Sequence, residues 1–211
     1  MSYAKYAMGL VSLQFISLNA LGSVNAFDTL GPDNTYGYSG VWFGHYEGYS
    51  ATCAQQFTPT ENGWLEEIYA SIEPDPYTPD RSFTLRLLTD ASNIPGETAL
   101  WSTTSYIWPS PEEEIYLLAD IGGPLLTAGQ TYWLQADKPV VMGSSHDWYS
   151  NEQGYQGRIA FSENGGPWSV YSDTEAYGLR IQVTPIPEPD TAGLLLPGLG
   201  LLWRRRRPPD S

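Results

Sequence analysis

The sequence has only two histidines and one cysteine among its 211 residues, which restricts the chemistry that it can carry. A zinc site needs three or four His, Cys or carboxylate ligands in a suitable spacing, and His45, His146 and Cys53 do not supply one. The acidic segment 73–80 lacks the alternating Asp/Asn pattern and the glycine of a calcium loop. We therefore expect no metal and no cofactor. A single cysteine cannot form an intramolecular disulfide, and the alternating apolar residues around Cys53 predict a buried, inert thiol.

Basic residues are scarce in the central part of the chain. Residues 27–184 hold five of them against 21 acidic residues, which gives this part a net charge of −16. Such a surface repels the phosphates of nucleic acids and of anionic lipids, so we expect no nucleic acid partner. Divalent cations, cationic partners and neutral polysaccharides are compatible with this charge. So is the simpler role of keeping the protein soluble.

No catalytic motif stands out in the sequence. The run Ser144-Ser145-His146-Asp147 contains the residue types of a hydrolase triad, but neighbours in sequence rarely assemble a triad in space. A glycine-rich loop that would cradle a phosphate is missing. The carboxylate pair of a glycoside hydrolase is a spatial feature, which the sequence alone does not single out. We therefore expect a protein that is not an enzyme, with a secreted glycan hydrolase as the less favoured alternative.

Long hydrophobic runs are also missing, and the two short ones lie at the ends of the chain. The first follows Lys5, covers residues 7–21 and precedes a Val-Asn-Ala sequence at residues 24–26. This order predicts a secretory signal peptide over residues 1–26, cleaved before Phe27. A membrane-anchoring helix is the alternative, and the run is short for one.

The C-terminal tail, residues 185–211, has three parts in a fixed order. A Pro187-Glu188-Pro189 tripeptide is followed by a 13-residue apolar segment at 191–203 and then by Arg204, Arg205, Arg206 and Arg207. The arginines hold their end of the segment on the cytoplasmic side of a membrane. As a helix the apolar segment spans about 20 Å, against about 30 Å for the hydrocarbon core. Such a short span suits a transient sorting device better than a permanent anchor.

This tail resembles the PEP-CTERM sorting signal of Gram-negative bacteria. In that family an exosortase, a membrane-embedded cysteine protease-like enzyme, is thought to recognise the tripeptide and remove the tail. The resemblance implies the export machinery and an exosortase-type enzyme as partners, a transient stay in the inner membrane, and delivery to the cell surface or extracellular matrix. Asp190 replaces the small hydroxyl residue usual in the family, and Pro197 interrupts the apolar run. An ordinary tail anchor, or an apolar end packed on the body, is the alternative.

Residues 27–184, between the two ends, predict an all-β domain. Short alternating apolar runs are separated by Gly, Pro and Asn, and no convincing helical period is present. The clearest strand covers residues 82–88, whereas residues 27–40 predict an irregular lead-in. Eight or nine such strands predict a two-sheet, jelly-roll-like sandwich, with a signal helix before it and a short membrane helix after it.

The same part of the chain resembles exported choice-of-anchor domains. The resemblance is carried by residues 55–58 (Gln-Gln-Phe-Thr), 83–87 (Phe-Thr-Leu-Arg-Leu) and 126–134 (Leu-Thr-Ala-Gly-Gln-Thr-Tyr-Trp-Leu). Domains of this group are β-sandwiches that are joined to differing C-terminal sorting signals. The resemblance therefore implies a fold and an exported location, and no particular activity.

Aromatic residues, 14% of the chain, provide the last functional signal. Residues 143–157 are rich in Gly, Ser and Asn, which predicts a loop, and they include Trp148, Tyr149, Asn151 and Tyr155. Aromatic rings stack on sugar rings and amide groups bond to sugar hydroxyls, so these four residues are a candidate site for an exopolysaccharide. Aromatic residues are also favoured in strands and cores, and packing is the stronger interpretation.

Overall fold

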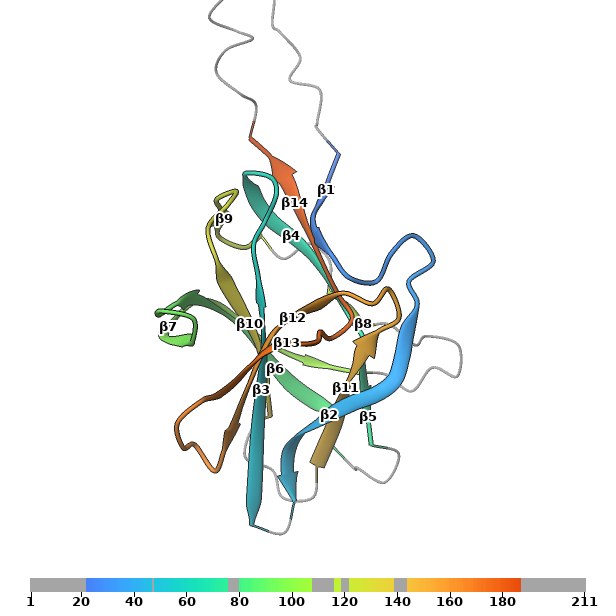
Figure 1. The fold of residues 1–211 in the computed structure, drawn as a ribbon, viewed down its shortest axis with the longest axis vertical. Helices are drawn as coiled ribbons and strands as arrows, with labels where there is room; N and C mark the ends of the chain where they lie inside the picture. The colour runs from blue at the N-terminus through green and yellow to red at the C-terminus, as the bar shows by residue number, and fades with distance from the viewer. Residues whose placement is uncertain are drawn as a thin grey trace, which may run out of the picture.

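The computed structural model of the protein describes residues 22–46, 48–75, 80–107, 116–118, 122–138 and 144–186. These residues form fourteen strands in two curled sheets, and no helix occurs among them (Figure 1). The predicted all-β class is confirmed. Residues 1–21 of the predicted signal helix, the predicted membrane helix, the tripeptide Pro187-Glu188-Pro189 and Arg204 to Arg207 lie outside the described residues. In the described part of the chain, no helix is long and apolar enough to span a membrane.

The smaller sheet has five strands and joins the two ends of the described chain. Its order is β1 (Val24–Asp28), β14 (Leu179–Pro185), β4 (Gly63–Ala70) and β8 (Tyr116–Leu118), and β9 (Leu125–Leu126) also pairs with β4. All of these pairs are antiparallel, with Val24 opposite Val183 and Asp28 opposite Arg180 in the outermost pair. β1 therefore begins, and β14 ends, at the same end of the molecule (Figure 1).

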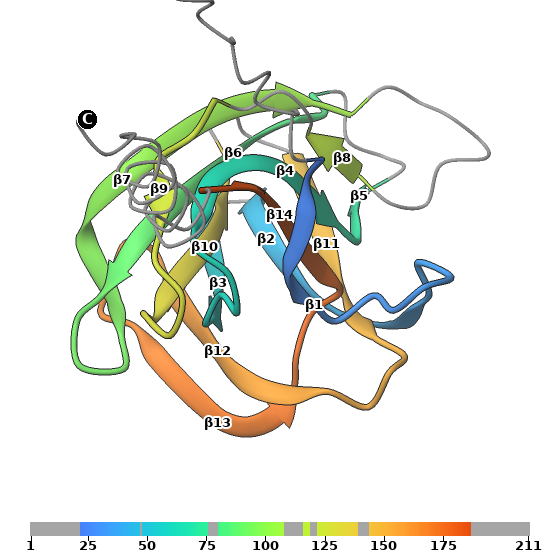
Figure 2. The same ribbon diagram turned by 90° about the horizontal axis from the view of Figure 1, so that it is seen from above.

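The larger sheet has nine strands. Its main path is β5 (Ile72–Pro74), β11 (Ser144–Asn151), β2 (Tyr36–Tyr46), β3 (Tyr49–Phe57), β10 (Tyr132–Asp137), β6 (Ser82–Asp90) and β7 (Pro95–Tyr106). The hairpin of β12 (Gln156–Glu163) and β13 (Ser169–Glu175) joins this path at β3, which pairs with β2, β10 and β12. Seen from above, the sheet curves from β7 and β6 round to β12 and β13, with β4 and β14 inside the curve (Figure 2).

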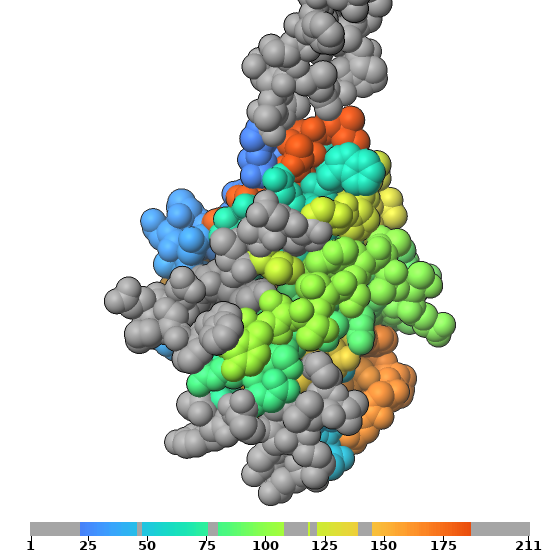
Figure 3. All heavy atoms as spheres, turned by 180° about the vertical axis from the view of Figure 1, so that it is seen from behind, coloured from blue at the N-terminus to red at the C-terminus, as the bar shows by residue number. Residues whose placement is uncertain are grey.

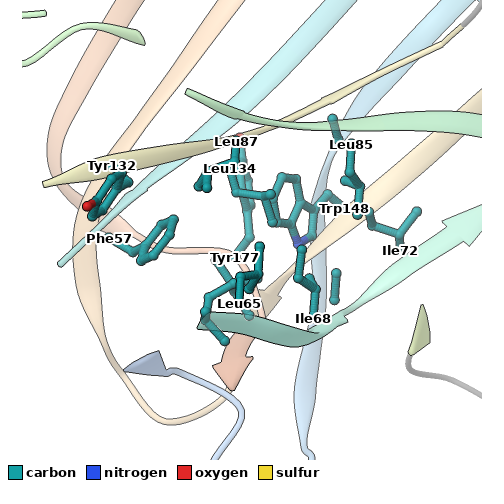
Figure 4. Close-up of a cluster of buried hydrophobic side chains, with 14 of the residues drawn as sticks. Phe57, Leu65, Ile68, Ile72, Leu85, Leu87, Tyr132, Leu134, Trp148 and Tyr177 are labelled. Atoms are coloured by element: carbon teal, nitrogen blue, oxygen red, sulfur yellow. The ribbon is translucent and has the colours of Figure 1, made fainter. Parts of the chain in front are cut away.

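The apolar core lies between the two sheets. Side chains alternate between the faces of a strand, so every second residue of a strand can point inward. β6 follows this rule as predicted, because Phe83, Leu85 and Leu87 are all buried. Both sheets contribute to one cluster (Figure 4), which includes Leu65, Ile68, Leu134, Trp148, Tyr177, Leu179 and Ile181. Cys53 is buried in the same cluster, so the prediction of a buried thiol is confirmed.

A second, smaller cluster covers the opposite face of the larger sheet. It contains Ala54, Leu88, Trp133 and Ala160, with Trp168 and Val170 packed against it. Trp133 neighbours a core residue in β10 and so points to the other face, where its Nε1 donates a hydrogen bond to Asp90 at 2.8 Å. β10 is therefore buried on both faces.

The strand boundaries differ from the prediction mainly in short or polar strands, which form because they pair with neighbouring strands. The predicted lead-in at 27–40 holds the end of β1 and the start of β2. The predicted cleavage point before Phe27 falls inside β1 in the described chain. Ala26 is fully buried, and its carbonyl oxygen accepts a hydrogen bond from the amide of Thr60 at 2.8 Å.

Candidate functional site

The four predicted glycan-binding residues do not form a loop. Trp148, Tyr149 and Asn151 belong to strand β11, and Tyr155 lies in the short connection to β12. Trp148 and Asn151 are fully buried, Tyr149 is half-buried, and only Tyr155 is exposed. The prediction of a loop here is wrong, because β11 pairs on both sides, with β2 and with β5.

The two fully buried residues, Trp148 and Asn151, hold the core and the end of β11 in place. The indole of Trp148 stacks on the ring of Tyr177 with 4.8 Å between centroids, and its Nε1 donates to the carbonyl of Gly178 at 3.1 Å. The amide of Asn151 donates to the carbonyl of Tyr155 at 2.9 Å and accepts from the amide of the same residue at 2.9 Å. For Trp148 the packing interpretation is therefore confirmed.

β11 has one face in the core and one face that is only partly open to solvent. His146 and Trp148 are fully buried, so the alternating residues Ser145, Asp147 and Tyr149 lie on the opposite face. This alternation separates His146 from its neighbours Ser145 and Asp147. The residue types of a hydrolase triad are present in this run, but they do not converge in space.

The neighbouring strands add two carboxylates and a tryptophan to the outer face. Asp147 lies directly opposite Glu73 of β5 on one side and Trp42 of β2 on the other. Directly paired residues have their side chains on the same face, with Cβ atoms about 5 Å apart. Beside them, the hydroxyl of Ser145 donates to Oδ2 of Asp75 at 3.0 Å.

Aromatic rings border these carboxylates. Trp42 stacks on Tyr49 of β3 with 5.6 Å between centroids and 28° between planes. Next to this pair is an open hollow of about 360 Å³, lined by Trp42, Tyr49, Asp75 and Ser145. Further along β2, Tyr36 stacks on Tyr149 at 5.5 Å. We call this surface the aromatic–acidic face; it consists of Tyr36, Trp42, Tyr49, Glu73, Asp75, Ser145, Asp147 and Tyr149.

The aromatic–acidic face has a negative electrostatic character. Partial burial raises the pKa of Asp147, and the charges of Asp75 and Glu73 raise this pKa further. Burial, the charge of Glu73 and a hydrogen bond to Glu73 together raise the pKa of Tyr149 to about 12. No basic side chain is among the groups that shift either pKa.

The chemistry of this face suits binding. Exposed aromatic rings accept the apolar face of a sugar, and carboxylates accept hydrogen bonds from its hydroxyl groups. Across the described ranges, no three His, Cys, Asp or Glu side chains are placed to hold a metal ion.

The fold and this face define the protein as an all-β, two-sheet domain with a partly exposed aromatic and acidic surface. No family model matches the chain, and no curated protein is significantly similar to it.

Proposed function

We propose that the protein is an exported, non-enzymatic domain that binds a polysaccharide through its aromatic–acidic face. In this proposal the signal peptide directs export, and the PEP-CTERM-like tail delivers the domain to the cell surface or the extracellular matrix. In the same proposal the two sheets form a jelly-roll-like sandwich, an architecture that also serves lectins. The observation that carries the binding function is the open hollow beside the stacked rings of Trp42 and Tyr49.

The dimensions of the face favour a polymer over a single sugar. Tyr36 and Trp42 pair with Asn151 and Asp147, which are four residues apart on β11, so the two aromatic residues lie about 13 Å apart along the sheet. Each ring is stacked on a partner from a neighbouring strand, so the face presents two aromatic platforms. Tyr38, which is 85% exposed, lies between them in sequence. A chain of several sugar units can therefore contact both platforms at once.

Replacing Trp42 with alanine is expected to weaken binding to the producer's own exopolysaccharide by about tenfold, which corresponds to about 1.4 kcal/mol. The stacked platform is then lost while the core is left unchanged, because Trp42 lies on the outer face. Affinity electrophoresis or pull-down on the polymer measures the effect. Trp64→Ala is the matched control, because Trp64 is 54% exposed and belongs to the smaller sheet.

Equal retention of the wild type and Trp42→Ala would remove this face as the binding site. The same polymer also tests the enzymatic alternative, for which Asp147 and its two neighbouring carboxylates are the favoured residues. A non-enzymatic domain leaves the number of reducing ends constant. A rise in reducing ends that Asp147→Asn abolishes would replace binding with hydrolysis.

The intact mass of the mature protein from its native host tests the sorting proposal. We expect a mass that lacks both residues 1–26 and the segment that ends in Arg204 to Arg207, because the signal peptidase and the exosortase-type enzyme remove them. Glu188→Ala should retain the tail and accumulate in the membrane fraction. A wild-type mass that still includes the four arginines would contradict the proposal. The same measurement locates the N-terminus, and a start at Phe27 would leave only Phe27 and Asp28 of β1.

A further inference from the structure

The carboxylates of the aromatic–acidic face stand in a strongly anionic neighbourhood. Asp147 and Glu73 are directly paired across β11 and β5, and Asp75 follows on the same face. On the other side of the hollow, a hydrogen bond to Glu163 of β12 raises the pKa of Tyr49. Like charges at this spacing repel one another, and a cation among them would turn the repulsion into attraction.

The protein's own cations are mostly engaged away from this face. Residues 27–184 contain only five basic side chains, and all five lie in the described part of the chain. Arg86 pairs with Asp137 at 2.9 Å, and Arg180 pairs with Asp28 at 2.8 Å. Arg158 bonds to Asn93 and Ser172, and Lys138 bonds to the carbonyl of Asp80. The fifth, Arg81, is close enough to the inner face of β11 for its charge to lower the pKa of His146.

The aromatic rings restrict which classes of cationic ligand fit this face. A ring face attracts an ammonium group as well as the apolar face of a sugar, so a ligand that has both can use Trp42 and the carboxylates together. A bare metal ion does not use the rings. A basic peptide can use both features, but its flexible side chains match a flat, open aromatic platform less well than a rigid sugar ring does.

We propose that the face recognises a polysaccharide whose sugars carry free amino groups, as in a partly de-N-acetylated hexosamine polymer. A sugar ring lies on the Trp42–Tyr49 platform, and its ammonium group pairs with Asp147 and Glu73. This inference rests on the proposed polysaccharide binding at the same face and specifies its ligand class.

Calorimetric titration with three β-linked oligomers of equal length tests the inference. The oligomers consist of glucosamine, N-acetylglucosamine or glucose, and they differ only in one ring substituent, which is an ammonium, an acetamide or a hydroxyl group. In mildly acidic, low-salt buffer the glucosamine oligomer is expected to bind at least about tenfold more tightly than the other two, the effect of a charge-assisted hydrogen bond. Added salt should reduce this preference, because it screens charge.

Two variants locate the effect. The double substitution Asp147→Asn and Glu73→Gln is expected to abolish the preference, because the amides that replace the two carboxylates carry no charge to pair with an ammonium group. The control Glu97→Gln makes the same kind of charge change on β7, which lies at the other end of the larger sheet, on the surface seen in Figure 3. It should leave the preference intact.

Each outcome separates the ligand class from the proposed function. Equal binding of all three oligomers, weakened by Trp42→Ala, would overturn the amino-sugar preference and keep polysaccharide binding. If Glu97→Gln lowers the preference as much as the double variant does, the preference arises from the net negative charge of the protein. That result would overturn the amino-sugar site. Tighter binding of an oligolysine than of the glucosamine oligomer would replace the sugar with a basic peptide. Binding of none of the probes or of the host polymer would overturn both proposals.

Discussion

Replacing Trp148 with alanine is expected to lower the free energy of unfolding by about 3–5 kcal/mol, the range for removing a large buried aromatic side chain. Trp148 is fully buried in the cluster between the two sheets, where Figure 4 shows it beside Tyr177. The substitution leaves a cavity and removes the stacked contact. It also leaves the carbonyl of Gly178 without the hydrogen bond that Nε1 donates.

Urea denaturation followed by circular dichroism measures this loss. Trp148→Phe keeps most of the apolar volume, so we expect it to be less destabilising than the alanine variant. Trp64→Ala is the control on the surface, where a change of less than about 1 kcal/mol is expected. If Trp148→Ala unfolds at the same urea concentration as the wild type, the indole does not contribute to the core as the structure indicates. Trp148 would then again be a candidate for ligand contact.

The fold class was predictable because the alternating pattern of the large strands is locally encoded. In β6, the three apolar residues at every second position, Phe83, Leu85 and Leu87, are the ones that belong to the core between the two sheets. β10 shows the limit of such patterns, because Trp133 and Leu134 are both buried, on opposite faces. The β12–β13 hairpin buries the second face of β10, so the sequence of β10 alone does not show that this face is covered.

The position of the site was not predictable in the same way. β11 has a polar composition because its outer face carries Ser145, Asp147 and Tyr149, while its inner face includes the polar His146. A strand with polar residues on both faces is indistinguishable by composition from a loop. The acidic residues of the site come from segments that only the sheet register brings together; Ser145 and Asp75 are 70 positions apart.

One local signal for the site was present in the sequence. In β2, Trp42 and Phe43 are adjacent aromatic residues, and neighbours in a strand point to opposite faces, so one of them must point away from the core. The structure buries Phe43 completely and leaves Trp42 on the outer face. The sequence does not determine which of the two residues points outward, because this depends on which face of the larger sheet the smaller sheet covers.

His146 is the titratable group most deeply embedded in the inner face of β11. Its ring stacks on Phe43 with 5.4 Å between centroids and lies 5.6 Å from Phe83. Nε2 lies 3.3 Å from the carbonyl oxygen of Arg81, and no group in the described part of the chain forms a hydrogen bond with Nδ1. Burial, and secondarily the charge of Lys138, lower the pKa of His146 from 6.5 to about 4.

This depressed pKa predicts a loss of stability in mild acid. Between pH 6.5 and about 4 the unfolded chain binds a proton at His146 that the folded chain does not, so the free energy of unfolding falls as the pH falls. The loss approaches about 3 kcal/mol below pH 4, because each unit of pKa difference corresponds to about 1.4 kcal/mol. The raised pKa of Asp147 acts in the opposite direction and offsets part of this loss.

Urea denaturation over this pH range should show the slope in the wild type and in His45→Gln. His146→Phe should flatten the slope, since phenylalanine fills the same aromatic stack without a titrating group. A slope that persists unchanged in His146→Phe would assign the acid sensitivity to other groups.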